Sequence, residues 1–247
     1  LGTAVYLLPL RHPVPVAKQV ATLDHLTEGR FIFGVGIGGE FPKEYAAAGV
    51  PHNERGKRLS AGIPLLRQLW SGEPVSYGGP FWGAFDEVAM QPATLRRGGP
   101  PIWCGGRSDA ALVRAGQIAD GYISYVVTPD MYRDSLDRIT AAAEAVGRTP
   151  ASYGTAHVLF TWIDDSFDKA LDVATHNLSR RYAMDFRRAA QRYCALGTPE
   201  QVAARIREFH AAGVRHIAIS PVGPDALVSQ QIERCAKDVL PLLRDLR

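Results

Sequence analysis

The chain has 247 residues, of which 46% are hydrophobic and 21% charged, a balance typical of a folded globular protein rather than a disordered one. Its net charge of +3 is spread over interspersed charges, so nothing indicates a nucleic-acid partner, and no apolar run is long enough to cross a membrane. Three widely spaced cysteines, Cys104, Cys194 and Cys235, argue against a disulfide framework or a metal site, and for a reducing, cytoplasmic location.

The first predicted element is a strand over residues 3–8. It opens the chain with no methionine before it, so we expect the true domain to begin upstream. A helix follows with Val16, Val20 and Leu23 on one face, and Gly29 is placed to end it. The order of strand and helix indicates an α/β protein from the start of the chain.

Residues 29–45 predict a strand, a glycine loop and the start of a helix. Residues 30–35 are β-branched and aromatic, as in a buried strand. Four glycines occur within six positions, including Gly38 and Gly39, and Glu40 ends the loop. Glycine lets a ligand approach the backbone closely, and such loops at the carboxyl ends of parallel strands bind phosphates and cofactors. The alternative is a tight connection that binds nothing, and spacing alone leaves both open.

A second helix is predicted over residues 54–70, with Gly62 and Pro64 expected to kink or weaken it. Residues 71–100 show no helical period. We expect an insertion there, a hairpin of residues 75–77 against 81–85 followed by a long loop. Such an excursion is either a lid over a site or a surface hairpin without a function.

A second junction of strand, glycines and helix follows the insertion. Residues 101–104 predict a strand and residues 110–118 a helix, with Gly105, Gly106, Arg107 and Ser108 between them. Backbone N–H groups and the positive end of the helix dipole would face an anion there. Arg107 would either neutralise a phosphate or face water.

The rest of the chain repeats the alternation. Strands are expected over residues 121–126, 153–163 and 214–220, and helices over residues 129–146, 166–184, 199–213 and 225–246. Repeated strand–helix units predict a (β/α)8 TIM barrel, with an open doubly wound sheet as the alternative. Six strands do not close an eight-stranded barrel, so we expect one domain over residues 1–247 that is incomplete at its N-terminus.

Polar and aromatic side chains follow these strands and would meet at the carboxyl rim of a barrel. They are His12, Glu40, Gly105 to Ser108, Ser124, Tyr125, Trp162 and Ser220. This set lacks metal-ligand spacing and a nucleophile elbow, and it suits an organic cofactor better than hydrolysis. The alternatives are a cap on the following turn for His12 and a solvated side chain for Glu40.

Four segments together resemble the bacterial luciferase family, also called luciferase-like monooxygenases. In family order they are LLPLRHPVPVAKQVATLDHLTEGRFIFGVGIGG, ERGKRLSAGIPLLRQLWSGEPVSY, PPIWCGGRSDAALVRAGQIADGYIS and GTPEQVAARIREFHAAGVRHIAISPVG. The resemblance covers most of the chain. It implies a (β/α)8 barrel of the luciferase-like type, which binds FMN or its deazaflavin analogue coenzyme F-420 at the carboxyl rim.

The resemblance also implies the positions of cofactor contacts. The first strand of this chain is similar to the family's third, whose non-proline cis peptide would fall at Ala4–Val5 and face the ring. Gly105, Gly106, Arg107 and Ser108 match the family's cofactor-phosphate site, and Gly38 and Gly39 count among the cofactor-binding residues. Two earlier family strands, which supply further ring contacts and a catalytic histidine in F-420 enzymes, are absent.

The sequence Gly38-Gly39-Glu40 resembles the glycine–glutamate of F-420-dependent reductases and dehydrogenases. The resemblance therefore implies hydride transfer at the ring of F-420, with Glu40 or His12 handling a proton. The alternatives are an FMN monooxygenase that uses reduced flavin and O2, and a cofactor-binding relative without turnover. The implied partners are a small organic substrate, a flavin or F-420 reductase and further copies of the chain, with no metal, nucleic acid or membrane.

Overall fold

The structure is a computed structural model that describes residues 1–39, 41–149 and 152–246. The chain divides into two compact units. The first comprises Leu1–Ile123 and Arg138–Gly154, and the second Ser124–Asp137 and Thr155–Arg247. Strand β6 (Gly121–Tyr125) and helix α5 (Pro129–Glu144) each run from one unit into the other. Among the described residues, no helix combines the length and apolar character needed to cross a membrane.

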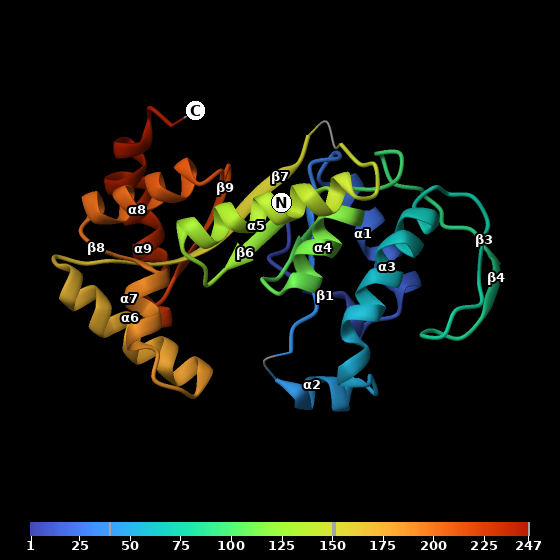
Figure 1. The fold of residues 1–247 in the computed structure, drawn as a ribbon, viewed down its shortest axis with the longest axis horizontal. Coiled ribbons are helices and arrows are strands. Elements are labelled where there is room, and N and C mark those ends of the chain that lie inside the picture. The colour runs from blue at the N-terminus through green and yellow to red at the C-terminus, as the bar shows by residue number, and fades with distance from the viewer. Residues whose placement is uncertain (40, 150–151, 247) are drawn as a thin grey trace. The chain divides into compact units, whose positions relative to one another are not determined.

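The first unit carries a parallel sheet in the order β1, β2, β5, β6, of which Figure 1 labels β1 and β6. Its other strands are β1 (Tyr6–Leu7), β2 (Phe33–Gly36) and β5 (Ile102–Gly105), and its helices are α1 (Pro13–Leu26), α2 (Pro42–Ala47), α3 (Arg55–Leu69) and α4 (Asp109–Ile118). Every residue of β2 and β5 is buried, as expected for parallel strands covered on both faces. The register aligns Tyr6 with Val35 and Val35 with Cys104, so the strands end together.

Helices α1 and α3 form because their apolar residues recur at helical spacing. Pro13 occupies the first position of α1, where its missing N–H costs nothing. Helix α3 buries Leu59, Ile63 and Leu66, and it runs unbroken through Gly62 and Pro64. A Cβ at Gly62 would lie 3.1 Å from the Leu8 side chain, so the glycine lets α3 pack closely on the segment after β1.

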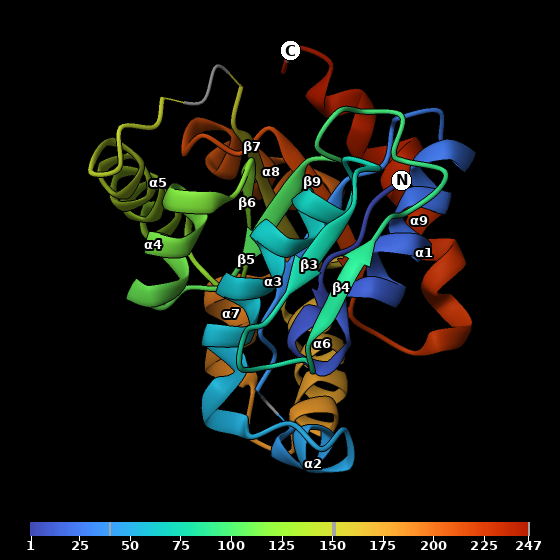
Figure 2. The ribbon, with the colours of Figure 1, turned by 90° about the vertical axis from the view of Figure 1, so that its right-hand side faces the viewer.

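The insertion is a hairpin of β3 (Val75–Tyr77) and β4 (Phe85–Val88) that lies beside α3 (Figure 2). The prediction that residues 81–85 form its second strand was wrong. Phe81 and Trp82 pack instead of pairing: Arg58 of α3 stacks 5.2 Å from the Phe81 ring centre, and Trp82 is buried. The pairing strand therefore starts only at Phe85, which faces Tyr77.

The loop after the hairpin is fastened to α1. The fully buried Asp24 accepts the backbone N–H groups of Leu95, at 2.8 Å, and Arg96, at 3.3 Å. The Nε2 atom of His25 lies 2.8 Å from the carbonyl oxygen of residue 93, and the Lys18 ammonium donates to the carbonyl of residue 91. Side chains of α1 thus hold this loop in place, while α3 contacts the hairpin.

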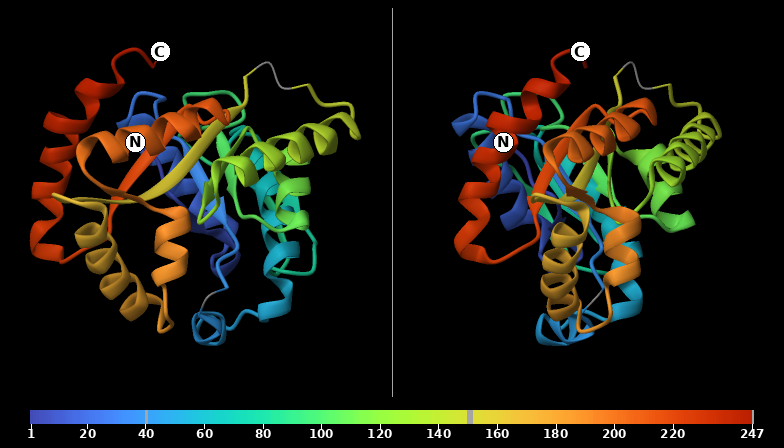
Figure 3. Two further views of the ribbon diagram at one scale, coloured as in Figure 1. Left: turned by 60° about the vertical axis from the view of Figure 1, so that its left-hand side comes forward. Right: turned by 90° about the vertical axis from the view of Figure 1, so that its left-hand side faces the viewer.

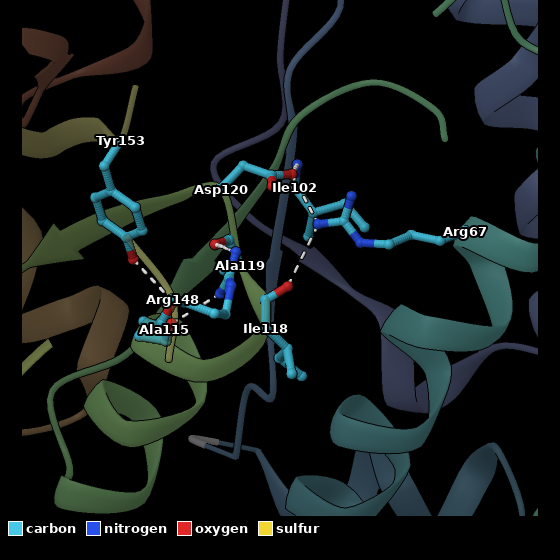
Figure 4. A network of polar contacts seen from close by, with 9 residues as sticks. Arg67, Ile102, Ala115, Ile118, Ala119, Asp120, Arg148 and Tyr153 are labelled. Carbon is cyan, nitrogen blue, oxygen red and sulfur yellow. Dashed lines mark hydrogen bonds and ion pairs between the residues drawn. The ribbon is translucent and has the colours of Figure 1, made fainter. Parts of the chain in front are cut away.

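A polar network surrounds the C-terminal end of α4 (Figure 4). The Asp120 carboxylate accepts the Arg67 guanidinium and the backbone N–H of Ile102, both at 2.8 Å. Arg148 and Tyr153 donate to carbonyl groups at the C-terminal end of the helix. These bonds satisfy carbonyls that a helix leaves without partners at its C-terminus, and they tie α4 to the start of β5.

The second unit is built on β7 (Gly154–Ile163), which pairs in parallel with β8 (Ala195–Gly197) and with β9 (His216–Pro221). Its helices are α6 (Phe167–Tyr182), α7 (Arg187–Tyr193), α8 (Pro199–Ala211) and α9 (Val228–Arg234). Helices α6 and α7 stand side by side in both views of Figure 3. Thr198 and Gln201 form the capping box that starts α8.

The expected last helix, residues 225–246, breaks into shorter turns. A 3-10 turn leads into α9, a π turn follows at Cys235–Val239, and a further 3-10 turn covers Leu240–Leu243. Helix α7 and strand β8 were not predicted. The strand of residues 153–163 and the helix of residues 166–184 were predicted to within two residues.

A buried histidine lies in the core of the second unit. His157 is fully buried, its Nδ1 atom lies 2.7 Å from Ser124 Oγ, and its ring stacks on Phe209 with ring centres 4.1 Å apart. Burial lowers the pKa of His157 to about 3, and the nearby Arg205 charge acts in the same direction. Ser124, expected among the rim residues, is committed to this interior contact.

All three cysteines are free and buried. Burial raises the pKa of Cys104 and of Cys194 to about 12, and it also raises the pKa of Cys235. None therefore carries the thiolate that reacts with disulfides or electrophiles near neutral pH.

Candidate functional site

The candidate site lies in the first unit, at the carboxyl ends of β1, β2 and β5. The Ala4–Val5 peptide bond is cis, at the position that the family resemblance implied. The Val5 side chain occupies space left by two glycines: a Cβ at Gly36 would lie 2.6 Å from its Cγ2 atom, and one at Gly105 would lie 3.1 Å from its Cγ1 atom. The structure therefore brings the predicted residues Val5 and Gly105 together, with Gly36 completing the slot.

The first glycine loop folds back over the end of β1. Gly38 and Gly39 have φ angles of +59° and +121°, which suit glycine, and a Cβ at Gly38 would lie 2.9 Å from the Leu7 side chain. The fully buried Tyr45 of α2 anchors this loop by donating its hydroxyl to the Ile37 carbonyl. Glu40, the predicted acid of the loop, lies outside the described residues.

The second glycine loop leads directly into the start of α4. Gly106 has a φ of +133°, and a Cβ there would lie 2.6 Å from the Cβ of Ala111, so only glycine brings the loop this close to α4. Ser108 is the N-cap residue of α4, and its carbonyl accepts the N–H groups of Ala111 and Leu112. Its hydroxyl makes no capping bond, which leaves this hydroxyl and the first N–H groups of the helix for a ligand.

Two charged side chains flank this loop. Arg107 is exposed. The Asp109 carboxylate forms an ion pair with the Arg138 guanidinium at 2.6 Å. The hydrogen bond from Arg138 lowers the pKa of Asp109 below its usual value. The paired arginine offsets a carboxylate that would otherwise repel an anion at the start of α4.

His12 caps α1. Its Nδ1 atom accepts the backbone N–H of Val14 at 3.2 Å, and its ring lies 6.3 Å, centre to centre, from Phe85 of the hairpin. Burial lowers the pKa of His12, so the imidazole is neutral at pH 7. The alternative interpretation of His12 as a cap is confirmed, and its catalytic role stays a prediction.

Comparison with known proteins decides the family. The family model for luciferase-like monooxygenases matches residues 1–216. The chain belongs to this family. It is 27% identical to an F-420-dependent glucose-6-phosphate dehydrogenase of Microbacterium testaceum, over 99% of this chain and 78% of the relative. It is 26% identical to an FMNH(2)-dependent dimethylsulfone monooxygenase of Pseudomonas putida, over 95% and 71% of the two chains.

Solved structures confirm the fold of this luciferase-like protein. An F-420-dependent secondary alcohol dehydrogenase in complex with an F-420–acetone adduct superimposes with a TM-score of 0.84 at 20% identity, over 99% of this chain and 79% of that one. The coenzyme F-420-dependent tetrahydromethanopterin reductase of Methanopyrus kandleri gives a TM-score of 0.77 at 22% identity, over 99% and 83%. The fold is the (β/α)8 TIM barrel of the luciferase-like type.

Two residues at the first glycine loop of this luciferase-like protein were missed by the sequence reasoning. A Cβ at Gly39 would lie 3.2 Å from Arg55 Nε and 3.6 Å from His52 Nε2. His52 lies in a 3-10 turn after α2 and Arg55 begins α3, so their approach to the loop depends on how the chain turns back. No local signal in the sequence predicts it.

The second unit holds a cavity of about 430 Å³, within the size range of small-molecule sites. Its lining comes from the end of α6 and from the loop after β9, and it comprises Asn177, Leu178, Arg180, Arg181, Pro221, Val222, Gly223 and Asp225. Among the residues that the structure describes, none of those predicted from the sequence as catalytic or cofactor-binding lines it.

Proposed function

We propose that this protein is an oxidoreductase that binds coenzyme F-420 or FMN at the ends of β1, β2 and β5 and supports hydride transfer at the cofactor ring. The observation that carries the proposal is the contact of Val5 with Gly36 and Gly105, directly before the anion nest of Gly106 to Ser108. F-420 and reduced FMN are the cofactors in the names of its relatives.

The residues present fit such a cofactor. Gly105, Gly106, Arg107 and Ser108 would hold its phosphate, because Gly106 admits the backbone close to α4 and the Ser108 hydroxyl is not used as a cap. The Ala4–Val5 segment would support one face of the ring, with Gly38 and Gly39 at its edge. When bound, the ring supplies the acceptor or donor of a hydride.

Proton handling falls to Glu40 or His12. The Nδ1 atom of His12 is engaged by Val14, so in the neutral ring the proton lies on Nε2, and that nitrogen is the one to exchange it. Glu40 follows Gly39 directly, as in the glycine–glutamate pattern of F-420 enzymes, and for this reason we favour F-420 over FMN.

The second candidate is an FMN monooxygenase that uses O2 and reduced flavin, in which a partner reductase supplies the reduced flavin. The match to the luciferase-like monooxygenase model and the relative from Pseudomonas putida favour it. In either case we propose a small organic substrate and a homodimer or larger assembly. Oxygen consumption that depends on substrate and reduced FMN would identify the monooxygenase.

The decisive experiment is a fluorescence titration of the protein with FMN and, separately, with F-420. It is repeated on Gly106→Asp, which places a carboxylate in the nest, and on Gly83→Asp in the hairpin, where a Cβ would have open space. We expect F-420 to bind and Gly106→Asp to weaken binding at least tenfold, with the control unchanged. FMN binding alone would favour the monooxygenase, and binding without any turnover a non-catalytic relative. Binding of neither cofactor would contradict the proposal.

A further inference from the structure

The cavity of about 430 Å³ in the second unit has an apolar part that the core of that unit holds in place. Leu178 of α6 and Val222 after β9 line it, and both are buried members of one hydrophobic cluster. The Val222 N–H donates to the Thr161 carbonyl at 3.0 Å, and a Cβ at Gly223 would lie 2.1 Å from the Trp162 ring. The loop after β9 therefore packs tightly on β7, and this part of the cavity is preformed, as is usual for small-molecule sites.

The charged side chains of the lining give the cavity a net positive charge. Arg180 and Arg181 come from the last turn of α6, and Asp225 begins the turn after β9. Within the described ranges neither arginine makes an ion pair, whereas Arg187 at the start of α7 is paired with Asp172 at 2.7 Å. Both arginines are exposed, so a ligand in solution can reach them.

The two arginines are the only lining residues that would attract an anion. The C-terminal end of a helix carries a partial negative charge, and the Asp225 carboxylate adds to it, so both would repel an anion. Arg181 is also partly held in position: its Cζ atom lies 5.8 Å from the Tyr182 ring centre, and Tyr182 stacks on the buried Phe186 with ring centres 5.1 Å apart. Any affinity for an anion here therefore depends on Arg180 and Arg181.

We propose that this cavity binds a small organic oxyanion, a phosphate monoester or a sulfonate with an apolar body. The guanidinium groups of Arg180 and Arg181 would take the oxyanion, because a planar guanidinium donates pairs of hydrogen bonds to such oxygens. The apolar body would lie against Leu178 and Val222, where its burial is favourable. The inference does not rest on the proposed function, since no described residue of the proposed cofactor site lines this cavity.

The first test follows the apolar part of the lining. Methyl 13C NMR of the full chain reports Leu178 and Val222, with resonances assigned from Leu178→Ile and Val222→Ala. The probes are phenyl phosphate, benzenesulfonate and benzyl alcohol, which carries the ring without a charge. We expect saturable shifts of both residues with at least one of the two anions, which identifies the preferred oxyanion, and none with benzyl alcohol. Methyl resonances that stay fixed with both anions, or that shift equally with the alcohol, would overturn the proposal.

Dissociation constants for the anion that shifts the methyl groups test the charges. The double variant Arg180→Gln/Arg181→Gln should weaken binding at least about tenfold, and Asp225→Asn should strengthen it about two- to fivefold, because it removes a repelling carboxylate. Arg188→Gln removes the same charge from an exposed position of α7 outside the lining and should change binding less than about twofold. Urea midpoints show that each variant still folds. A double variant that loses stability but binds as wild type would show that the arginines only offset the helix end, and it would overturn the proposal.

Gly106→Asp separates this cavity from the proposed phosphate site of residues 105–108. We expect the Leu178 and Val222 shifts to saturate at the same phenyl phosphate concentration in Gly106→Asp as in wild type. If Gly106→Asp abolishes the binding of phenyl phosphate and the double arginine variant leaves it unchanged, the cavity proposal is wrong and the proposed function stands. If neither FMN nor F-420 binds but the anion still shifts both residues, the proposed function fails and the cavity site is retained.

Discussion

The carboxylate of Asp24 accepts the backbone N–H of Leu95 across 2.8 Å, and this bond joins α1 to a loop 71 residues further along the chain. Asp24 is fully buried, and it also accepts the N–H of Arg96. The insertion is thus held to α1 by one buried carboxylate oxygen, Asp24 Oδ2, which accepts two backbone N–H groups, as well as by apolar contacts.

We expect Asp24→Ala to lower the free energy of unfolding by about 2–4 kcal/mol, because it leaves two backbone N–H groups without their acceptor. Urea denaturation measures the change. Glu28→Gln is the control, since Glu28 is 83% exposed and its contact with Arg30 is long, at 3.7 Å. Equal stabilities for the two variants would show that the insertion is held by other contacts.

The buried His157 makes stability depend on pH. Its pKa is about 3 in the folded protein and about 6.5 when unfolded, so the unfolded state binds the extra proton between these values. The contribution of His157 is fully present above pH 6.5, and it falls by up to about 1.4 kcal/mol per pH unit below it. Unfolding in urea from pH 7.5 to 4.5 should show this slope.

His157→Gln should remove that part of the slope, whatever it does to stability at pH 7.5. His176→Gln, at an exposed position of α6, should leave the slope unchanged. A wild-type curve that is no steeper than that of His157→Gln would contradict the neutral, buried state of the ring.

The close packing of Val5 against Gly36 predicts that substitutions at these two positions have coupled effects on stability. Gly36→Ala places a methyl group 2.6 Å from Val5 Cγ2 and should destabilise the protein by about 1–3 kcal/mol. Val5→Ala removes the clashing methyl groups, so the double variant should be more stable than the sum of the single variants implies, by about 0.5–3 kcal/mol. A double-mutant cycle on unfolding free energies gives this coupling. Additive effects would mean that the two side chains do not compete for space.

The Asp120 network predicts a contrast between two ion pairs. Asp120→Ala removes the acceptor of both Arg67 and the Ile102 N–H, and it should cost about 1.5–3 kcal/mol. Asp130→Asn breaks an ion pair with Arg133 at a similar distance, but Asp130 is 87% exposed, and the loss should be below about 0.5 kcal/mol. Thermal or urea unfolding distinguishes the two, and similar losses would contradict the role of burial.

Both junctions of strand, glycines and helix in the first unit could be predicted from the sequence. A strand that is buried on both faces needs a continuous apolar run, and the glycine loops stand out in composition, so both strands were recognised. Strand β5 was placed to within one residue, whereas β2 starts at Phe33, three residues after its predicted start. Helix α4 was placed to within one residue at its start. These elements are predicted by the pattern of neighbouring residues, which can be read directly from the sequence.

What escaped prediction depends on tertiary contacts. Strand β8 has three residues, too few for a period, and it exists because Leu196 pairs opposite Trp162 of β7. Helix α7 has seven residues and is held by contacts such as the 2.7 Å ion pair of Arg187 with Asp172 of α6. The second hairpin strand begins later than predicted because Phe81 packs against Arg58 of α3 instead of pairing in the hairpin.

Tertiary contacts also explain why part of the candidate site could not be predicted. Gly105 and Val5 could be named from the resemblance, but the contact between Gly36 and Val5 and the approach of Arg55 to Gly39 require the fold. An arginine at the start of a helix has the same local pattern whether it faces water or a loop. The burial of the Arg55 Nε atom, which has no acceptor in the described part of the chain, becomes visible only in three dimensions.

The burial of the three cysteines makes this chain ready for labelling without removing a native residue. Their thiols stay protonated and shielded, so a maleimide dye would find nothing to attack in the folded protein. A thiol introduced by Ala110→Cys, on the exposed first turn of α4, would be the one reactive position. A dye attached there would lie beside the glycine loop of residues 105–108, so ligand binding at the proposed phosphate site should change its emission.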